Sequence, residues 1–205
     1  ANGTIVGGSC NNTSGICAFV GGGLCNSVIP NVGVVGGGTR NVVCVGVDSA
    51  ILGGCRNVTC GVGVTIGGGQ LNLSKCNNSF LGGGSQNTQT SNFGVLGGGF
   101  KNLISGGCDG QVIVGGGQHT SSAFYTFIGG GQLHTITASD CTTIVGGASN
   151  SICQCAKLSA IVGGSCNVIK NSKPQFAQFI GAGVGNNTCG GTWNNTSGCW
   201  SVAPS

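Results

Sequence analysis

One motif recurs twelve times between residues 5 and 186, and it limits the possible folds more than any other feature of the chain. Each copy has two apolar residues, two or three glycines and then a short step to Asn. Successive glycine pairs are 14 to 18 residues apart, which is too short for helical-hairpin repeats and fits one coil of a β-solenoid. The sequence therefore predicts an all-β fold, a glycine-rich β-solenoid of about twelve short coils over residues 1–186.

Each coil is expected to hold two short strands joined by loops of four to eight residues. The first strand ends at the apolar pair, and the second begins near the Asn, because a β-forming residue often follows two positions later. Helix is disfavoured by about 1 kcal/mol per glycine, and glycine does not recur at every third position as in collagen. The apolar pairs are Ile5-Val6, Phe19-Val20, Val34-Val35, Ile51-Leu52, Thr65-Ile66, Phe80-Leu81, Val95-Leu96, Ile113-Val114, Phe127-Ile128, Ile144-Val145, Ile161-Val162 and Phe179-Ile180.

Two adjacent apolar residues predict that both faces of their strand are buried, because successive strand side chains point to opposite faces. One face fills the coil. The other requires a partner, since an apolar stripe along a whole solenoid would be an unusually large exposed patch. We therefore expect self-association, as a trimer or a head-to-tail filament. A single thick coil with an exposed stripe is the alternative.

The repeat glycines are expected either to let another backbone approach closely or to adopt a positive φ at a corner. A phosphate-binding loop is disfavoured, because such a loop occurs once, between a strand and a helix. The repeat glycines are Gly21, Gly22, Gly36, Gly37, Gly67, Gly68, Gly82, Gly83, Gly97, Gly98, Gly115, Gly116, Gly129 and Gly130.

The Asn column has two explanations. Asn tolerates left-handed turns and caps nearby backbone groups, and Asn side chains stacked in register also hydrogen-bond along the axis as a ladder. Two later copies place Thr120 and His134 in the Asn position, and His119 then falls in the solvent-facing column just before it, with Arg40 and Arg56. The column is clearest at Asn26, Asn41, Asn57, Asn72, Asn87 and Asn102.

Fourteen cysteines without a Cys-x-x-Cys pair favour disulfides over zinc sites. Stacked coils are about 4.8 Å apart, a spacing that suits a disulfide between matching positions of adjacent coils. Matching positions predict the pairs Cys10–Cys25 and Cys44–Cys60, and Cys189–Cys199 would close a local loop near the C-terminus.

Disulfides place the protein outside the cytosol, in an extracellular location or on a virion or cell surface. Asn-x-Ser/Thr sequons support the same compartment, although a chain rich in Asn, Ser and Thr produces them by chance. The candidate glycosylation sites are Asn2, Asn11, Asn12, Asn57, Asn72, Asn77, Asn186, Asn194 and Asn195.

The sequence offers little for catalysis, and we expect no enzyme activity, no cofactor and no metal. Asp48, Asp109 and Asp140 are the only acids and lie in variable loops, so a paired-carboxylate mechanism lacks its pair. His119 and His134 lack the nearby carboxylates that would complete a metal site. The net charge of +4 is scattered, which disfavours nucleic-acid binding, and no apolar run is long enough to span a bilayer.

Residues 187–205 leave the repeat. They contain Cys189, Trp193, Cys199 and Trp200, and we predict that they form a C-terminal cap or a segment that reaches another subunit.

The motif Phe/Ile-Val/Ile-Gly-Gly-Gly-x-x-Asn over residues 5–186 resembles glycine-rich repeats in surface and tail-fibre proteins of large DNA viruses and phages. More distantly, it is similar to the head repeats of trimeric autotransporter adhesins. The resemblance implies a trimeric or filamentous β-solenoid that holds or presents adhesive surfaces. The many cysteines depart from the bacterial pattern and favour a eukaryotic, eukaryote-virus or archaeal exterior.

These observations favour a structural subunit of an extracellular or virion-surface fibre. The first alternative is an adhesive solenoid that binds a glycan or another cell-surface ligand, with Phe124, Tyr125 and the two Trp residues as candidates. The second is an ice-binding protein. It fits less well, because its Thr candidates are neither on every coil nor in one column: Thr4, Thr65, Thr126 and Thr143.

Overall fold

The structure is a computed structural model that describes residues 3–106, 109–153, 156–170, 175–187, 191–194 and 199–202. It is an all-β parallel solenoid of about 11 turns, which confirms the predicted fold. The chain divides into two compact units, residues 1–101 (unit 1) and residues 102–205 (unit 2). Within the described ranges, no helix is long and apolar enough to cross a bilayer.

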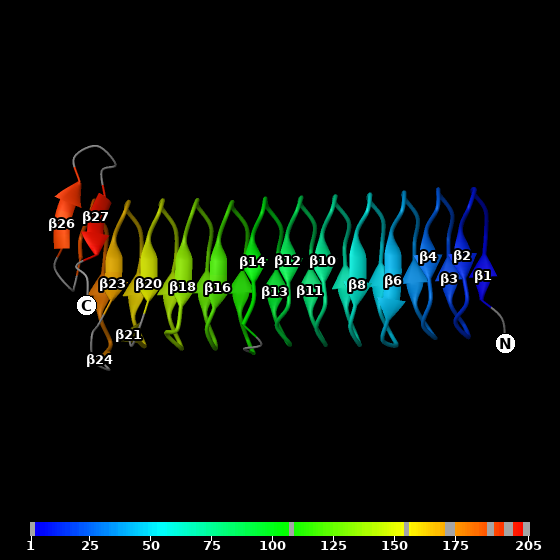
Figure 1. Ribbon diagram of the computed structural model, residues 1–205, viewed down its shortest axis with the longest axis horizontal. Coiled ribbons are helices and arrows are strands. Elements are labelled where there is room, and N and C mark those ends of the chain that lie inside the picture. Colours follow the sequence, from blue (N-terminus) through cyan, green and yellow to red (C-terminus); the bar gives the residue numbers. More distant parts are fainter. Residues whose placement is uncertain are drawn as a thin grey trace. The chain divides into compact units, whose positions relative to one another are not determined.

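Each turn of unit 1 contributes one short strand to each of two parallel sheets. In Figure 1 the successive turns follow one another from β1 (blue) to β13 (green). One sheet contains, in order, β1 (Thr4–Ile5), β3 (Phe19–Val20), β5 (Val34–Val35), β7 (Ala50–Ile51), β9 (Thr65–Ile66), β11 (Phe80–Leu81) and β13 (Val95–Leu96). The other contains β2 (Asn12–Thr13), β4 (Ser27–Val28), β6 (Val42–Val45), β8 (Val58–Cys60), β10 (Leu73–Ser74) and β12 (Thr88–Gln89).

Unit 2 repeats this arrangement and adds two further strand pairs. Its odd-numbered sheet contains β15 (Val112–Ile113), β17 (Phe127–Ile128), β19 (Thr143–Ile144), β22 (Ala160–Ile161) and β25 (Phe179–Ile180). The other sheet contains β14 (Leu103–Ile104), β16 (Thr120–Ser122), β18 (Thr135–Thr137), β20 (Ser151–Cys153) and β23 (Val168–Lys170). The additional pairs are β21 (Ala156–Lys157) parallel to β24 (Gln175–Phe176), and β26 (Gly191–Asn194) antiparallel to β27 (Cys199–Val202). The last pair lies in the segment expected to leave the repeat.

The strand register corrects five of the twelve apolar pairs. In the turn of β7, for example, Ile51 is fully buried and Leu52 is 60% exposed, so Leu52 stands where other turns have their first glycine. A one-residue slip would turn the large inward side chain outward, so burial of that residue sets the register. The corrected pairs are Thr4-Ile5, Ala50-Ile51, Val112-Ile113, Thr143-Ile144 and Ala160-Ile161.

The interior of each unit is a stack of aliphatic side chains, one from each turn of the odd-numbered sheet. These residues have no exposed surface: Val20, Val35, Ile51, Ile66, Leu81 and Leu96 in unit 1, and Ile113, Ile128, Ile144 and Ile161 in unit 2. Several polar residues that share the interior are hydrogen-bonded, as most buried polar groups are. The Ser49 hydroxyl donates to the Gly61 carbonyl at 2.7 Å, and the Ser74 and Ser79 hydroxyls bond to each other at 2.8 Å.

A buried ladder of Asn side chains runs along one corner of unit 1. At Asn57, the backbone N–H donates to Oδ1 of Asn41 at 3.0 Å. Its own Nδ2 donates to the carbonyl oxygens of Gly53 and Gly69, at 3.1 and 3.0 Å. The same N–H to Oδ1 bond joins Asn11, Asn26, Asn41, Asn57, Asn72 and Asn87 at separations of 15 or 16 residues. Of the two explanations for the column, the structure has the ladder.

The third glycine of the motif makes this ladder possible. Gly38 has a φ of 90°, and a Cβ there would lie 2.1 Å from the Gly54 carbonyl oxygen and 2.7 Å from Nδ2 of Asn41. No side chain fits, so the position requires glycine for both its conformation and its contacts. The glycines singled out from the sequence are mostly the first two of each motif, and the most constrained position is the third.

Replacing Asn57 with Ala should destabilise unit 1 strongly. The change leaves the buried N–H of Asn72 and the carbonyls of Gly53 and Gly69 without their Asn57 partners, which we expect to cost roughly 3 kcal/mol or more. Urea unfolding followed by circular dichroism measures the loss. Arg56→Ala, at the exposed neighbouring position, is the matched control and should change stability little; equal losses in the two variants would contradict the ladder.

Candidate assembly surface

The odd-numbered strands present two outward columns, which we call the apolar face of each unit. The first column is the first residue of each strand, and the second lies two residues later, so it points the same way. In unit 1 the pairs are Thr4/Val6, Phe19/Gly21, Val34/Gly36, Ala50/Leu52, Thr65/Gly67, Phe80/Gly82 and Val95/Gly97. In unit 2 they are Val112/Val114, Phe127/Gly129, Thr143/Val145, Ala160/Val162 and Phe179/Gly181. None of these residues is charged.

In each turn that has Phe or Leu in one column, the other column holds Gly or Ala. Every Phe of the first column is followed by Gly in the second, and the ring lies over that glycine: a Cβ at Gly21 would be 3.4 Å from Cε1 of Phe19. Where the second column instead holds Val or Leu, the first holds Thr, Ala or Val. Two large side chains therefore never share a turn of the apolar face, although the height of the face varies, because Val34, Thr65 and Val95 are also followed by Gly.

This face is exposed in the single chain. Phe80 is 45% exposed and Leu52 is 60% exposed, whereas the inward residues of the same strands are fully buried. Burial of the inward face is therefore confirmed. No other part of the described chain covers the outward face, so its burial against a partner stays a prediction. The outer side of the even-numbered strands differs, since it includes polar and charged residues such as Asn12, Ser27 and Lys75.

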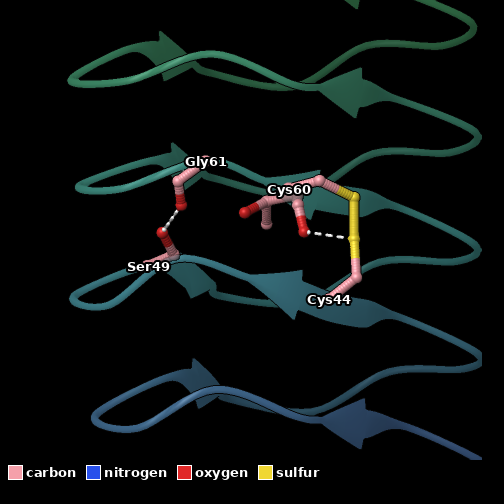
Figure 2. The surroundings of a disulfide bond; sticks show 5 residues. Cys44, Ser49, Cys60 and Gly61 are labelled. Atoms are coloured by element: carbon pink, nitrogen blue, oxygen red, sulfur yellow. Dashed lines mark hydrogen bonds between the residues drawn. A yellow bond between two sulfur atoms is a disulfide. The ribbon is translucent and has the colours of Figure 1, made fainter.

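The predicted disulfide between Cys44 and Cys60 is confirmed. The two residues belong to β6 and β8 on adjacent turns, and their Cα atoms are 5.1 Å apart. Figure 2 shows the bond crossing directly between the two turns, with the Ser49 to Gly61 hydrogen bond joining the same turns elsewhere. The spacing between coils therefore accommodates a disulfide, as expected from the matching positions of the two cysteines.

Cys10 and Cys25 share one outward column on adjacent turns, as predicted, and both are free thiols in the structure. The pKa of the Cys10 thiol lies below its usual value. The main cause is a hydrogen bond from the Ser9 hydroxyl, and a hydrogen bond from the Cys25 thiol adds to it. Desolvation raises the pKa of the Cys25 thiol, and the neighbouring Cys10 thiol raises it further. Their bridge stays a prediction. The side chains of the third predicted pair, Cys189 and Cys199, lie outside the described residues.

Both histidines are ladder residues, so the predicted Asn-column position of His134 is confirmed and the predicted solvent-facing position of His119 is wrong. His119, not Thr120, occupies the Asn column: its N–H donates to Oδ1 of Asn102, and its Nδ1 accepts the N–H of His134 at 3.1 Å. His134 Nδ1 in turn accepts the N–H of Asn150. Both side chains are fully buried, and their rings stack with centroids 4.9 Å apart. The sequence places His119 one residue off because it takes Ile113-Val114, not Val112-Ile113, as the apolar pair of that turn.

Burial lowers the pKa of His119 to about 4, with His134 adding to the effect, and burial also lowers the pKa of His134. Because each Nδ1 accepts a backbone N–H, the neutral ring must carry its proton on Nε2. A proton on Nδ1 would point at the backbone N–H that this nitrogen accepts in the neutral ring, and the hydrogen bond would be lost. This arrangement suits a structural role, and among the described residues no group of three or more His, Cys, Asp and Glu side chains is placed to hold a metal ion.

The sequons differ in accessibility. Asn57 and Asn72 are buried in the ladder, with Nδ2 bonded to glycine carbonyls, so the folded chain offers no acceptor there. Asn12, Asn77 and Asn186 are exposed, and Asn11 is partly exposed. Among the Thr candidates for ice binding, Thr126 is buried, which removes it from any surface array. Asn2, Asn194 and Asn195 lie outside the residues with described side chains.

The fold and this surface define the chain as a glycine-rich parallel β-solenoid repeat protein. No protein-family model matches the chain, and no curated protein matches it with significant similarity.

The buried histidines predict a loss of stability in acid. Because the pKa of His119 falls from 6.5 unfolded to about 4 folded, the unfolded chain binds more protons between these values. Stability should therefore be full above pH 6.5 and decline as the pH falls towards 4, by on the order of 3 kcal/mol for His119. Urea unfolding at a series of pH values measures this. The double variant His119→Asn/His134→Asn should flatten the profile, and an unchanged slope would count against the assignment.

The thiols of Cys10 and Cys25 should form a disulfide in mild oxidant. With glutathione disulfide, the Cys10 thiolate displaces one glutathione thiolate, and the Cys25 thiolate then displaces the second, so two electrons pass to glutathione. Peptide mapping without reductant should recover a Cys10–Cys25 cross-link beside Cys44–Cys60. The variant Cys25→Ser should instead retain one glutathione on Cys10. Recovery of Cys10 as a free thiol in the wild-type chain would contradict the prediction.

Proposed function

We propose that the chain is a structural subunit of an extracellular or virion-surface fibre, and that it self-associates through its apolar face. The observation that carries the proposal is that this face is apolar, uncharged and continuous from turn to turn in each unit, with exposed side chains such as Phe80 and Leu52. A second sheet can cover such a face, because two sheets pack face to face about 10 Å apart.

The absence of charge from both columns supports the same function. Exposed sheet surfaces in monomeric proteins usually carry charged or polar residues, and extended apolar patches mark interaction sites. Each turn adds one strand to the apolar face at the same spacing. Another copy of this chain has the same spacing and can therefore pack against this face turn by turn. We propose a trimer or a filament as the resulting assembly.

The interior also suits a structural role. Each turn of the ladder is bound to the next by backbone hydrogen bonds and by the Asn side chain, so tension along the axis is spread over many parallel bonds. The Cys44–Cys60 disulfide joins two turns covalently, which fits an oxidising location outside the cytosol.

A charge placed on the apolar face should weaken assembly strongly. Burial of one Phe is worth about 2 kcal/mol, so Phe80→Lys should weaken association roughly 30-fold or more. Negative-stain microscopy and light scattering after size exclusion measure the particles formed, and the mass separates a trimer from a filament. The wild-type chain should give uniform oligomers or filaments, and Phe80→Lys should give monomers.

Phe93→Lys is the matched control, because Phe93 is 58% exposed and lies at a turn outside the apolar face. It should assemble like the wild-type chain. A wild-type chain that stays monomeric at high concentration would overturn the proposed function. Equal loss of assembly in both Lys variants would overturn the assignment of the apolar face.

A further inference from the structure

Unit 2 departs from the regular repeat at one corner. Ladder residues that are 15 or 16 positions apart in unit 1 are separated by 15, 16, 17 and 19 positions along unit 2 after His119. The added residues all fall in one place, between an even-numbered strand and the next odd-numbered one, because the strands on either side stay in register. In solenoids, lengthened loops on one side often form the binding surface.

The lengthened corner carries a hollow of about 500 Å³ lined by Phe124, Tyr125, Asp140, Cys141, Lys157 and Leu158. These residues form three matching pairs on three successive turns. The backbone under them is fixed by hydrogen bonds between turns: the N–H of Cys141 donates to the Phe124 carbonyl, and the N–H of Leu158 donates to the Asp140 carbonyl. The side chains therefore project from a rigid support.

Tyr125 forms an open aromatic platform. Its side chain is 65% exposed. On the other side the ring rests on Gly110, where a Cβ would be only 2.6 Å from Cδ1 of Tyr125. The ring of Phe124 lies 6.3 Å away, tilted by 38°, and Leu158 is 58% exposed. A ligand with an apolar flat side can stack on these surfaces.

An ion pair supplies polar groups in the same hollow. Lys157 Nζ lies 3.0 Å from Oδ2 of Asp140, and Oδ1 of Asp140 accepts the N–H of Phe124 at 3.2 Å. The carboxylate is thus held in place and the two charges balance, so the hollow favours a neutral ligand. Both groups are partly exposed and can still exchange hydrogen bonds with hydroxyl groups.

We propose that this hollow binds a neutral pyranose sugar. A pyranose has a flat C–H face that stacks on an aromatic ring, and its edge carries hydroxyls that both accept and donate hydrogen bonds. The C–H face would stack on Tyr125, and hydroxyls at the edge would bond to the Asp140 carboxylate and the Lys157 ammonium. The site does not depend on the proposed fibre function, because all of its residues lie in unit 2 and outside the apolar face.

Saturation-transfer NMR on the full chain tests the proposal. The probes are the methyl glycosides of glucose, galactose, mannose and N-acetylglucosamine, with cyclohexanol as an apolar comparison. At least one glycoside should receive saturation mainly at the C–H protons of one ring face, and more strongly than cyclohexanol. No transfer to any of the four glycosides, or equal transfer to cyclohexanol, would overturn the sugar site.

Three variants locate the binding. Tyr125→Ala should weaken binding about tenfold, and Phe93→Ala, which removes an exposed aromatic ring at a comparable left-handed turn of unit 1, should leave it unchanged. Asp140→Asn keeps the oxygen that accepts the Phe124 N–H but loses the ion pair, so it should weaken binding while circular dichroism stays that of the wild-type chain. Equal effects of Tyr125→Ala and Phe93→Ala would show non-specific contact and overturn the site. Phe80→Lys should retain sugar binding, which separates this proposal from the failure of assembly.

Discussion

In each regular turn, one Asn side chain forms hydrogen bonds with three backbone groups. Its oxygen accepts an N–H from the next turn, and its nitrogen donates to two glycine carbonyls. This contact requires the neighbouring backbone to pass where any Cβ would stand, so glycine with positive φ must accompany the Asn. The Asn side chain and the glycine together fix the conformation of this corner of the coil. Successive turns then stack, because the Asn Oδ1 of each corner accepts the backbone N–H of the Asn in the next turn. The strands are only two to four residues long and could not hold a sheet alone.

Once the corner is fixed, the rest of the turn can vary. The inward position is occupied by Val, Ile or Leu because it fills the coil, and the outward position of the strand is less constrained, so Phe alternates there irregularly with Thr, Ala and Val. The position two residues later is limited by the backbone of the next turn: a Cβ at Gly21 would lie 2.3 Å from the Gly36 carbonyl oxygen.

Unit 2 uses the same frame with two changes. Histidine replaces Asn on two turns, where its Nδ1 serves as the acceptor that Oδ1 provides elsewhere, and the cost is a pair of buried rings that favour the neutral form. At another corner the later loops lengthen, and an aromatic pair lies there beside an ion pair. Ladder and sheet stay in register across both changes, because the added residues lie outside the hydrogen-bonded positions.

The sequence by itself determined the β-solenoid, the two strands in each turn, the Asn column and the Cys44–Cys60 disulfide, because all of these follow from spacing along a regular repeat. It did not determine the register of five apolar pairs, since Ile51-Leu52 and Ala50-Ile51 are both apolar and only burial separates them. The slip at Ile113-Val114 also moved His119 out of the ladder position, and the third glycine was missed because its constraint comes from a positive φ and close backbone contact. The members of the outward columns and the hollow at the lengthened corner were decided by the tertiary structure, because they depend on which side chains point outward together and on where added residues accumulate between turns.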